Sequence, residues 1–302
     1  MDRHDIYKER IRINLNIEDC PLCKNNSLYF SHTINSYSVI KCKKCRVQFL
    51  SPFPNPETLN PIYGSDYFLG SHDLDSITRI WALKRKTADL YLEQFQSMGG
   101  LQNGDLLEIG CGTGDFLVES QSKGYNVSGI EISHHAVAMA NKKLNFNKVQ
   151  QGTLEQIEFP SNSFDVIAFF DVIEHINSPT GFIAQAYKLL RPGGKIFLVT
   201  PSLDSWSARL LGIHWMEYKL EHLWYFSNKA ISILLENTGF KNVHILPNPK
   251  ILDLDYINMH FQRYYVPFFS PLVKVIRTIV PDSLALHPIR LIASGMAVIA
   301  EK

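Results

Sequence analysis

The feature that most constrains the fold of this chain is a short apolar run followed by three alternating glycines. The run is Asp105 to Ile109, and Gly110, Gly112 and Gly114 come directly after it. Because glycine lacks a Cβ atom, it permits positive φ angles in a tight turn and lets a ligand approach the backbone closely. The stretch therefore predicts a strand, a ligand-binding loop for a nucleotide-like molecule and the start of a helix.

The glycine loop departs from the dinucleotide-binding fingerprint. That fingerprint reads G-x-G-x-x-G/A, and Asp115 stands where its last glycine or alanine is required. Glu108 precedes the loop, and its carboxylate can accept hydrogen bonds from an ammonium or hydroxyl group of a ligand. Glu131 ends the next apolar run, where an acid can bind both ribose hydroxyls. These acids favour a ligand that carries a cationic amino acid over a pyrophosphate.

Strands and helices are predicted to alternate from Asp105 onward, which is typical of a doubly wound parallel sheet. Glu108-x-Gly110-x-Gly112-x-Gly114 and the later segments 151–155, 164–167, 171–175 and 190–195 resemble, in order, the motifs of class I S-adenosylmethionine-dependent methyltransferases. The resemblance implies an α/β, Rossmann-like, seven-stranded sheet that binds S-adenosyl-L-methionine. An NAD-dependent oxidoreductase would use the same first loop, but it would not explain Glu108 and Asp115 together.

The resemblance also implies where the cofactor is held. Contacts are expected from the glycine loop, from strand ends and from groups beside the adenine: Glu108, Gly110, Gly112, Gly114, Glu131, Ile132, Thr153, Leu154 and Asp171. Thr153 departs from the pattern, because many relatives carry an acid beside the adenine. We therefore expect backbone groups near Thr153 and Leu154 to make the adenine contact.

Cysteine spacing is the second strong signal in the chain. Cys20, Cys23, Cys42 and Cys45 form two C-x-x-C pairs, and the β-rich segment between them can bring the pairs together as a hairpin. This spacing matches a zinc ribbon, although a redox pair and free buried thiols are alternative readings. Four thiolate ligands leave no open position on Zn²⁺, so the ion is expected to be structural.

Length and composition indicate one large domain and a smaller one, since 302 residues with 45% hydrophobic content can bury a full core. The expected parts are a zinc-ribbon module at 1–50, a linker and lid at 51–76, and a cofactor-binding methyltransferase domain at 77–302. Acceptor insertions are expected at 202–227 and 248–294. Tyr63 and Tyr67 are lid candidates, and packing of these rings onto the core explains them equally well.

Methyl transfer from a sulfonium needs alignment of donor and acceptor, and one base when the acceptor is a hydroxyl. Our first candidate for that base is His222, which falls in the segment where similar methyltransferases carry His-Leu-x-x-Phe-Ser. His175 and His214 are the other candidates. A structural histidine that bonds a backbone carbonyl is an equally good reading of His222, and His175 can instead support the loop under the cofactor.

The acceptor class follows partly by elimination. The segment after the fourth strand lacks an Asn-Pro-Pro-Tyr-like sequence, which disfavours methylation of DNA bases. The layout resembles enzymes that methylate sugars, glycans and natural products, so a small-molecule, sugar, glycan or lipid-linked acceptor and O-methylation are expected. The aromatic segment 256–293 is compatible with an acceptor pocket, a homodimer contact or a peripheral membrane contact.

The net charge and the first residues bear on nucleic-acid binding and on cellular location. The formal net charge of +1 provides no global field that would attract nucleic acid. The first residues are polar and charged, so they lack the apolar core of a secretory signal, and a cytoplasmic location is expected. A non-catalytic zinc-ribbon binding protein is a further alternative, although it would have no need of Glu108 and Glu131.

Overall fold

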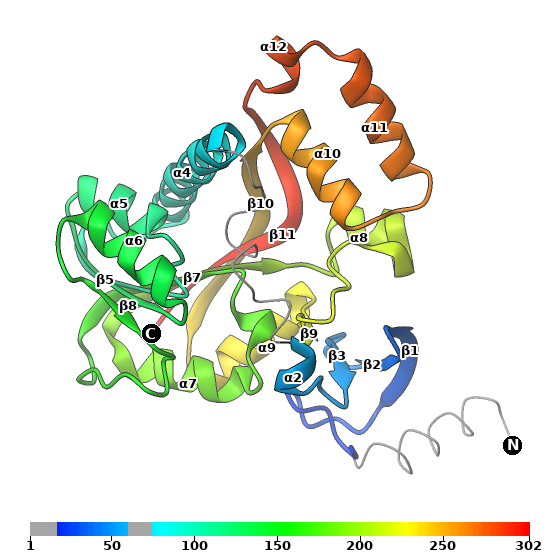
Figure 1. The fold of residues 1–302 in the computed structure, drawn as a ribbon. Coiled ribbons are helices and arrows are strands. Elements are labelled where there is room, and N and C mark those ends of the chain that lie inside the picture. Colours follow the sequence, from blue (N-terminus) through cyan, green and yellow to red (C-terminus); the bar gives the residue numbers. More distant parts are fainter. Residues whose placement is uncertain (1–16, 60–73) are drawn as a thin grey trace, which may run out of the picture.

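The computed structural model describes residues 17–59 and 74–302, and it contains a large and a small β-sheet (Figure 1). Tyr63 and Tyr67 lie outside the described residues, so their role as a lid stays a prediction. Within the described ranges, no helix is both long enough and apolar enough to cross a membrane.

The large sheet has seven strands and confirms the predicted doubly wound fold. Its order is β10 (Lys241–Leu252), β11 (Ile289–Glu301), β8 (Leu190–Pro201), β7 (Phe164–Phe170), β4 (Gly104–Ile109), β5 (Tyr125–Glu131) and β6 (Val149–Gln151). The strands from β8 to β6 pair in parallel, whereas β11 runs antiparallel to both of its neighbours, as expected for the last strand. The carboxyl ends of the parallel strands meet at one edge, where ligands of such sheets bind.

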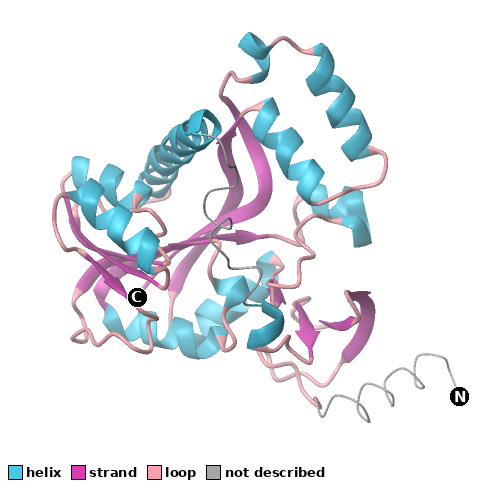
Figure 2. Cartoon of the chain, in the orientation of Figure 1, coloured by secondary structure: helices cyan, strands magenta, loops and turns pink. Residues whose placement is uncertain are grey.

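Helices cover both faces of this sheet (Figure 2). One face packs against α4 (Leu74–Ser97), α5 (Asp115–Ser122) and α6 (His134–Leu144), and the other against α7 (Pro179–Leu189) and α9 (Asn228–Thr238). Leu106 and Leu107 of β4 are both fully buried, yet they belong to the cores on opposite faces. Because both faces of a parallel sheet are covered, its strands appear in the sequence as continuous apolar runs.

The small sheet joins the cysteine-rich segment to the rest of the fold. Its order is β1 (Leu28–Ile34), β2 (Tyr37–Cys42), β3 (Gln48–Ser51) and β9 (Trp224–Tyr225), and a short helix α2 (Pro56–Leu59) follows β3. β9 comes from the insertion 202–227, and Phe49 pairs with Trp224. The Ser227 hydroxyl also donates to the Cys45 carbonyl oxygen at 2.9 Å. The cysteine-rich segment is therefore joined through β9 to the insertion 202–227, a pairing that the sequence does not predict.

Several strand limits differ from the sequence-based expectation. The sequence predicts strands at 243–246 and 295–300, but β10 and β11 extend much further and pair along most of their length. Pro247 and Pro249 argue against a long strand, and β10 tolerates them because it is the edge strand of the sheet. The sequence also predicts a turn at 191–194; these residues lie within β8, at a register shift opposite β7 where Gly193 has a φ of 78°.

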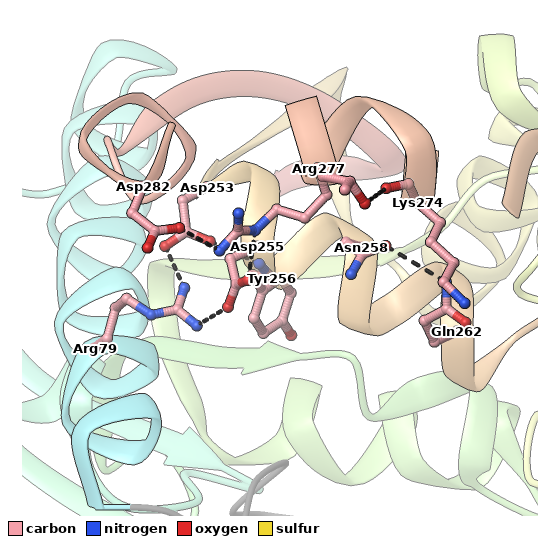
Figure 3. Close-up of polar contacts among 10 residues, drawn as sticks. Arg79, Asp253, Asp255, Tyr256, Asn258, Gln262, Lys274, Arg277 and Asp282 are labelled. Carbon is pink, nitrogen blue, oxygen red and sulfur yellow. Dashed lines mark hydrogen bonds and ion pairs between the residues drawn. The ribbon is translucent and has the colours of Figure 1, made fainter. Parts of the chain in front are cut away.

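The insertion 248–294 forms a helical layer. It contains α10 (Leu254–Arg263), α11 (Phe269–Ile279) and the single turn α12 (Asp282–Ala285), whereas the insertion 202–227 contains α8 (Trp206–Leu211) and a 3-10 turn at Gly212–His214. An ion-pair network fixes α10 and α11 to α4 (Figure 3). Arg79 of α4 contacts Asp253 and Asp255, each at 2.5 Å, and Arg277 of α11 contacts Asp255 at 2.8 Å.

Replacing Arg79 with alanine should destabilise this helical layer. The Asp253 side chain is fully buried, and without Arg79 its charge loses its ionic partner. Removing one member of a buried ion pair costs about 3 to 5 kcal/mol. We expect faster amide hydrogen exchange in 254–279 and a lower melting temperature. The matched control is Arg85→Ala on the same helix, whose arginine is 64% exposed and whose pair with Glu119 should contribute about 1 kcal/mol or less. Equal effects of the two substitutions would contradict this interpretation.

Candidate active site

The glycine loop between β4 and α5 requires glycine for conformational and steric reasons. Gly110 and Gly114 have φ angles of 71° and 76°, which L side chains rarely adopt. A Cβ atom on Gly110 would lie 2.6 Å from Val172 Cγ2, and one on Gly114 would lie 2.9 Å from Ala140 Cβ. The loop therefore lies tightly against its neighbours and exposes its backbone at the carboxyl edge of the sheet.

Glu131 fixes this loop from the end of β5. Its Oε2 accepts a hydrogen bond from the Gly112 amide and its Oε1 accepts one from the Ser133 amide, both at 2.9 Å. The carboxylate is 4% exposed, and each oxygen retains a second lone pair. The adjacent Ile132 is 58% exposed. The arrangement suits a diol that approaches from the open side of the loop.

Glu108 lies beneath the loop, and no basic side chain of the described residues forms an ion pair with it. The residue is 4% exposed, and its Oε2 has no hydrogen-bond partner among the residues that the structure describes. Burial raises the pKa of Glu108 well above its usual value, and the nearby Asp115 and Glu131 carboxylates add to this effect. A cationic ligand group beside Glu108 would relieve the cost of this buried, unpartnered carboxyl oxygen.

A cavity of about 270 Å³ opens beside these groups. Its lining comes from the glycine loop, from α4, and from the ends of β7 and β10, and includes Glu108, Gly110, Gly112, Asp115, Lys84, Tyr91, Asp171, Lys250 and Tyr256. Asp171 follows β7 with a positive φ of 54° and forms an ion pair with Lys250 at 2.9 Å. Of the predicted cofactor residues, Glu108, Gly110, Gly112 and Asp171 therefore line one cavity, together with Lys250 and Tyr256, which are not among the predicted cofactor residues.

The other predicted cofactor residues do not occur in the lining of this cavity, namely Gly114, Glu131, Ile132, Thr153 and Leu154. Thr153 and Leu154 follow β6, and the Leu154 side chain is buried while its carbonyl oxygen accepts a hydrogen bond from Gln185 at 2.6 Å. The Thr153 amide donates to the Gln156 side chain at 3.0 Å. Their contact with an adenine stays a prediction.

A second cavity of about 200 Å³ adjoins the first and shares Asp171, Lys250 and Tyr256 with it. The rings of His175 and His222 meet here edge to face, with centroids 4.8 Å apart. His175 Nδ1 lies 2.9 Å from the Glu221 carbonyl oxygen, and His222 Nδ1 lies 2.9 Å from that of Glu217. Because a carbonyl can only accept, each Nδ1 carries the proton and each Nε2 carries the lone pair.

Burial keeps both imidazoles neutral. It lowers the pKa of His175 to about 4 and that of His222 well below its usual value. Burial also raises the pKa of the adjacent Glu174 to about 8. Glu174 is 1% exposed, its Oε2 accepts a hydrogen bond from the Thr200 hydroxyl at 3.0 Å, and its Oε1 has no partner within 17–59 and 74–302. The ligand atoms of Glu174, His175 and His222 lie within 4.8 Å of one another.

The structure brings together two of the three predicted base candidates. His214 is exposed on the turn after α8, and it does not occur among the described residues that line the two cavities. The walls of the second cavity include Glu217 and Lys219 from one insertion and Tyr256 and His260 from the other. The sequence does not single out Glu217, Lys219 or His260, because no periodicity or motif marks which part of a long insertion faces a cavity. Tyr256 begins the aromatic segment 256–293, whose sequence is compatible with an acceptor pocket.

The four predicted metal ligands lie together at the base of the small sheet. Cys20 and Cys45 Sγ are 3.6 Å apart, as are Cys23 and Cys42 Sγ, and all four sulfur atoms lie within 4.8 Å of one another. A tetrahedral zinc ion with bonds of 2.3 Å requires sulfur atoms about 3.8 Å apart. The donor set and its geometry therefore fit Zn²⁺, and none of these cysteines forms a disulfide.

Comparison with known proteins identifies the family. The family model described as "Methyltransferase domain" matches residues 80–245, more than half of the chain, so this chain belongs to the methyltransferase family. The family supports S-adenosylmethionine as the cofactor. Among solved structures, a methyltransferase of Bacillus halodurans C-125 covers 70% of this chain and 98% of its own, with a TM-score of 0.50 at 17% identity. At this identity the match supports the fold.

Curated relatives match the same region. The mitochondrial ubiquinone biosynthesis O-methyltransferase of Schizosaccharomyces pombe is 31% identical over 157 residues, which are 49% of this chain and 56% of that protein. The ubiquinone biosynthesis O-methyltransferase of Pseudomonas aeruginosa is 32% identical over 130 residues, which are 41% of this chain and 55% of that protein. This chain thus spans about half the length of the curated relatives it matches.

Proposed function

We propose that this protein transfers a methyl group from S-adenosyl-L-methionine to a hydroxyl group of a small-molecule acceptor. The observation that carries the proposal is the pair of buried acids around the glycine loop. Glu108 has a carboxyl oxygen without a partner among the described residues, and this oxygen can contact a cation. Backbone amides orient the Glu131 carboxylate, which can accept hydrogen bonds from a diol. A ligand with an amino-acid ammonium and a ribose satisfies both. The names of the curated relatives favour oxygen as the acceptor atom.

The proposed cofactor contacts follow the predicted set. The backbone of Gly110, Gly112 and Gly114 approaches the ligand, and Glu108 lies on the side of its amino-acid portion. Asp171 closes the cavity next to Lys250. Ile132, Thr153 and Leu154 are proposed to surround the adenine, since they follow the strand ends beyond Glu131.

The two insertions are proposed to form the acceptor site. Residues 202–227 contribute Glu217 and His222 to the second cavity, and residues 248–294 contribute Tyr256 and His260. The cavity shares three residues with the cofactor cavity, so an acceptor placed there faces the donor. Sugar, glycan and lipid-linked acceptors remain compatible with it. A homodimer, a membrane contact through 256–293 and a cytoplasmic location stay predictions.

When bound, S-adenosylmethionine supplies an electrophilic methyl group, and the chain has to orient the acceptor and accept one proton. We propose that His222 accepts this proton at Nε2. The bond from its Nδ1–H to the Glu217 carbonyl orients the ring, and burial keeps the imidazole neutral. His175 is the second candidate, because its ring contacts that of His222. His214 ranks third, because it is exposed on the turn after α8 and does not line the cavity.

We further propose that Cys20, Cys23, Cys42 and Cys45 bind one structural Zn²⁺ and that residues 1–50 form the zinc-ribbon module. The sulfur geometry supports this assignment. Residues 51–76 are proposed as linker and lid, and 77–302 as the methyltransferase domain. The pairing of β9 with β3 means that the ribbon also supports the acceptor insertion.

Replacing Glu131 with alanine should weaken binding of S-adenosylhomocysteine by about 1.5 to 3 kcal/mol, since hydrogen bonds to a charged group are lost. This corresponds to a dissociation constant roughly 10- to 150-fold higher. Isothermal titration calorimetry provides the measurement. Glu158→Ala, which removes an exposed acid in the loop after β6, should leave the affinity unchanged. Parent-like affinity of the Glu131 variant would show that the ribose contact is assigned wrongly.

The activity itself can be tested with S-adenosylmethionine that carries a tritiated methyl group. The protein is incubated with a panel of phenols, catechols and sugars, and the products are separated from the cofactor. We expect tritium in an O-methyl product and an equal amount of S-adenosylhomocysteine. Transfer to amines or carbon acceptors alone would contradict the proposed acceptor atom.

A further inference from the structure

We propose that a third cavity, between the small sheet and the insertion 202–227, binds the phosphate group of a small molecule. This cavity has a volume of about 220 Å³, and none of its described lining residues also lines the cofactor cavity or the second cavity. Phosphate binding there does not depend on the proposed methyl transfer.

One side of the third cavity is formed by the small sheet. Lys41 of β2 pairs with Gln48 of β3 in an antiparallel register, so the two side chains lie on the same face of the sheet. Both line the cavity, together with Ser31, His32 and Arg46 from the same module. The other lining residues come from the insertion and are Leu203, Ala208, Gly212, Ile213, Tyr218 and Ser227. Two segments that are far apart in the sequence therefore enclose this space.

The lining of the third cavity is basic. Among the described residues it includes Lys41 and Arg46 but no aspartate or glutamate. Lys41 forms no ion pair with the described residues, and its ammonium lies 6.0 Å from the centroid of the Tyr29 ring. Asp204 lies outside the lining and contacts both Arg46 at 3.2 Å and Arg209 at 3.9 Å, so one carboxylate serves two arginines. Positive charge therefore remains at this wall and attracts an anion.

Hydrogen-bond donors accompany this charge. Gln48 is 6% exposed, and its Oε1 accepts a hydrogen bond from the Tyr218 hydroxyl at 3.0 Å. The bond orients the amide and leaves Nε2, which donates to no described residue, available to a ligand. Lys41 adds an ammonium group, and Arg46 adds a planar fork that matches phosphate oxygens. A phosphate ester has a charge of about −1.5 to −2 at pH 7 and three acceptor oxygens, so it matches these donors better than a carboxylate does.

His32 can report on occupancy of this cavity. Its ring packs edge to face on Tyr218, with centroids 4.4 Å apart, and its Nδ1 lies 3.1 Å from the Ser31 hydroxyl oxygen. Burial lowers the pKa of His32, and its Nε2 has no partner in the described part of the chain. Because a nearby anion favours the protonated imidazole, bound phosphate should raise this pKa and shift the NMR signals of the ring.

The direct test is calorimetric titration of the protein, in chloride buffer, with inorganic phosphate and separately with methyl phosphate. We expect saturable binding with one site per chain. Lys41→Gln and Arg46→Gln should each raise the dissociation constant roughly 10-fold or more, since a hydrogen bond to a charged group is lost. Lys44→Gln is the matched control, because it removes an exposed lysine of the second C-x-x-C pair that does not line the cavity. It should bind phosphate as the parent does.

The two probes distinguish the source of the phosphate group. Tighter binding of methyl phosphate would indicate a phosphate ester as the ligand, and tighter binding of inorganic phosphate would indicate the free ion. Either result supports the site. A melting temperature equal to that of the parent shows that a variant is folded.

NMR spectra of the parent, with histidine rings labelled, locate the bound ion. We expect the His32 signals, assigned by comparison with His32→Gln, to move on addition of phosphate, and those of the exposed His244 to stay in place. The site would be overturned by absence of saturable binding of both probes, by equal affinities of Lys41→Gln and Lys44→Gln, or by His32 signals that phosphate leaves unchanged. The spectra of the parent decide by themselves if a variant does not fold.

Discussion

Replacing Cys42 with serine should remove the zinc and unfold the small sheet. Structural zinc sites of this type contribute an apparent binding free energy of about 10 to 16 kcal/mol, which is also folding free energy. The buried residues of β1 to β3 belong to the same core as those of α7 and α9, and β9 depends on β3 for its pairing. We therefore expect loss of zinc by elemental analysis, rapid alkylation of the remaining ribbon thiols and a markedly lower melting temperature.

The chain offers a matched control for this experiment. Cys111 is also buried, but it lies in the glycine loop and outside the four-cysteine cluster. Cys111→Ser should therefore keep one zinc per chain. The assignment would be refuted by metal-free parent protein whose four ribbon thiols are readily alkylated and whose melting temperature equals that of a zinc-loaded sample.

Replacing His222 with alanine should reduce turnover by about 10²- to 10⁴-fold, the usual contribution of a positioned base. The affinity for S-adenosylhomocysteine should stay nearly unchanged, because His222 lines the second cavity and not the first. Tritium transfer gives the rate and calorimetry gives the affinity. His244→Ala, which removes an exposed imidazole, should have no effect on either quantity.

Two other outcomes for His222→Ala would point to a different role of this histidine. Loss of cofactor binding or of folding would favour a structural histidine whose bond to the Glu217 carbonyl supports the loop. Unchanged turnover with the true acceptor would exclude His222 as the base and direct attention to His175, whose ring it contacts.

The sequence predicts the parts of the site whose structure is determined by residues adjacent in the chain. The run from Asp105 to Gly114 predicts the strand and the loop, because glycine at positive φ and buried leucines leave few other conformations. The cysteine spacing predicts the metal cluster for a similar reason. Each C-x-x-C pair is a single turn, and a hairpin of 28–42 joins the two.

The parts that the sequence does not predict depend on contacts between distant segments. β9 has two residues and no detectable alternation, so nothing in the sequence indicates its pairing with β3. The sequence identifies His175 and His222 separately, but the meeting of their rings depends on how the loop before β9 returns to β7. Helix α11 exposes Leu272, Val275 and Ile279, and the apolar residues of α10 are only half-buried, so burial does not define these helices as it does the core helices.

The most direct test of the central claim is calorimetric titration of the parent protein with S-adenosylhomocysteine and, separately, with NADH. The account predicts saturable binding of S-adenosylhomocysteine with one site per chain, because its ammonium and ribose match Glu108 and Glu131. It predicts no measurable binding of NADH, since Asp115 occupies the position that a dinucleotide loop requires for glycine or alanine. Binding of NADH without binding of S-adenosylhomocysteine would contradict the proposed function.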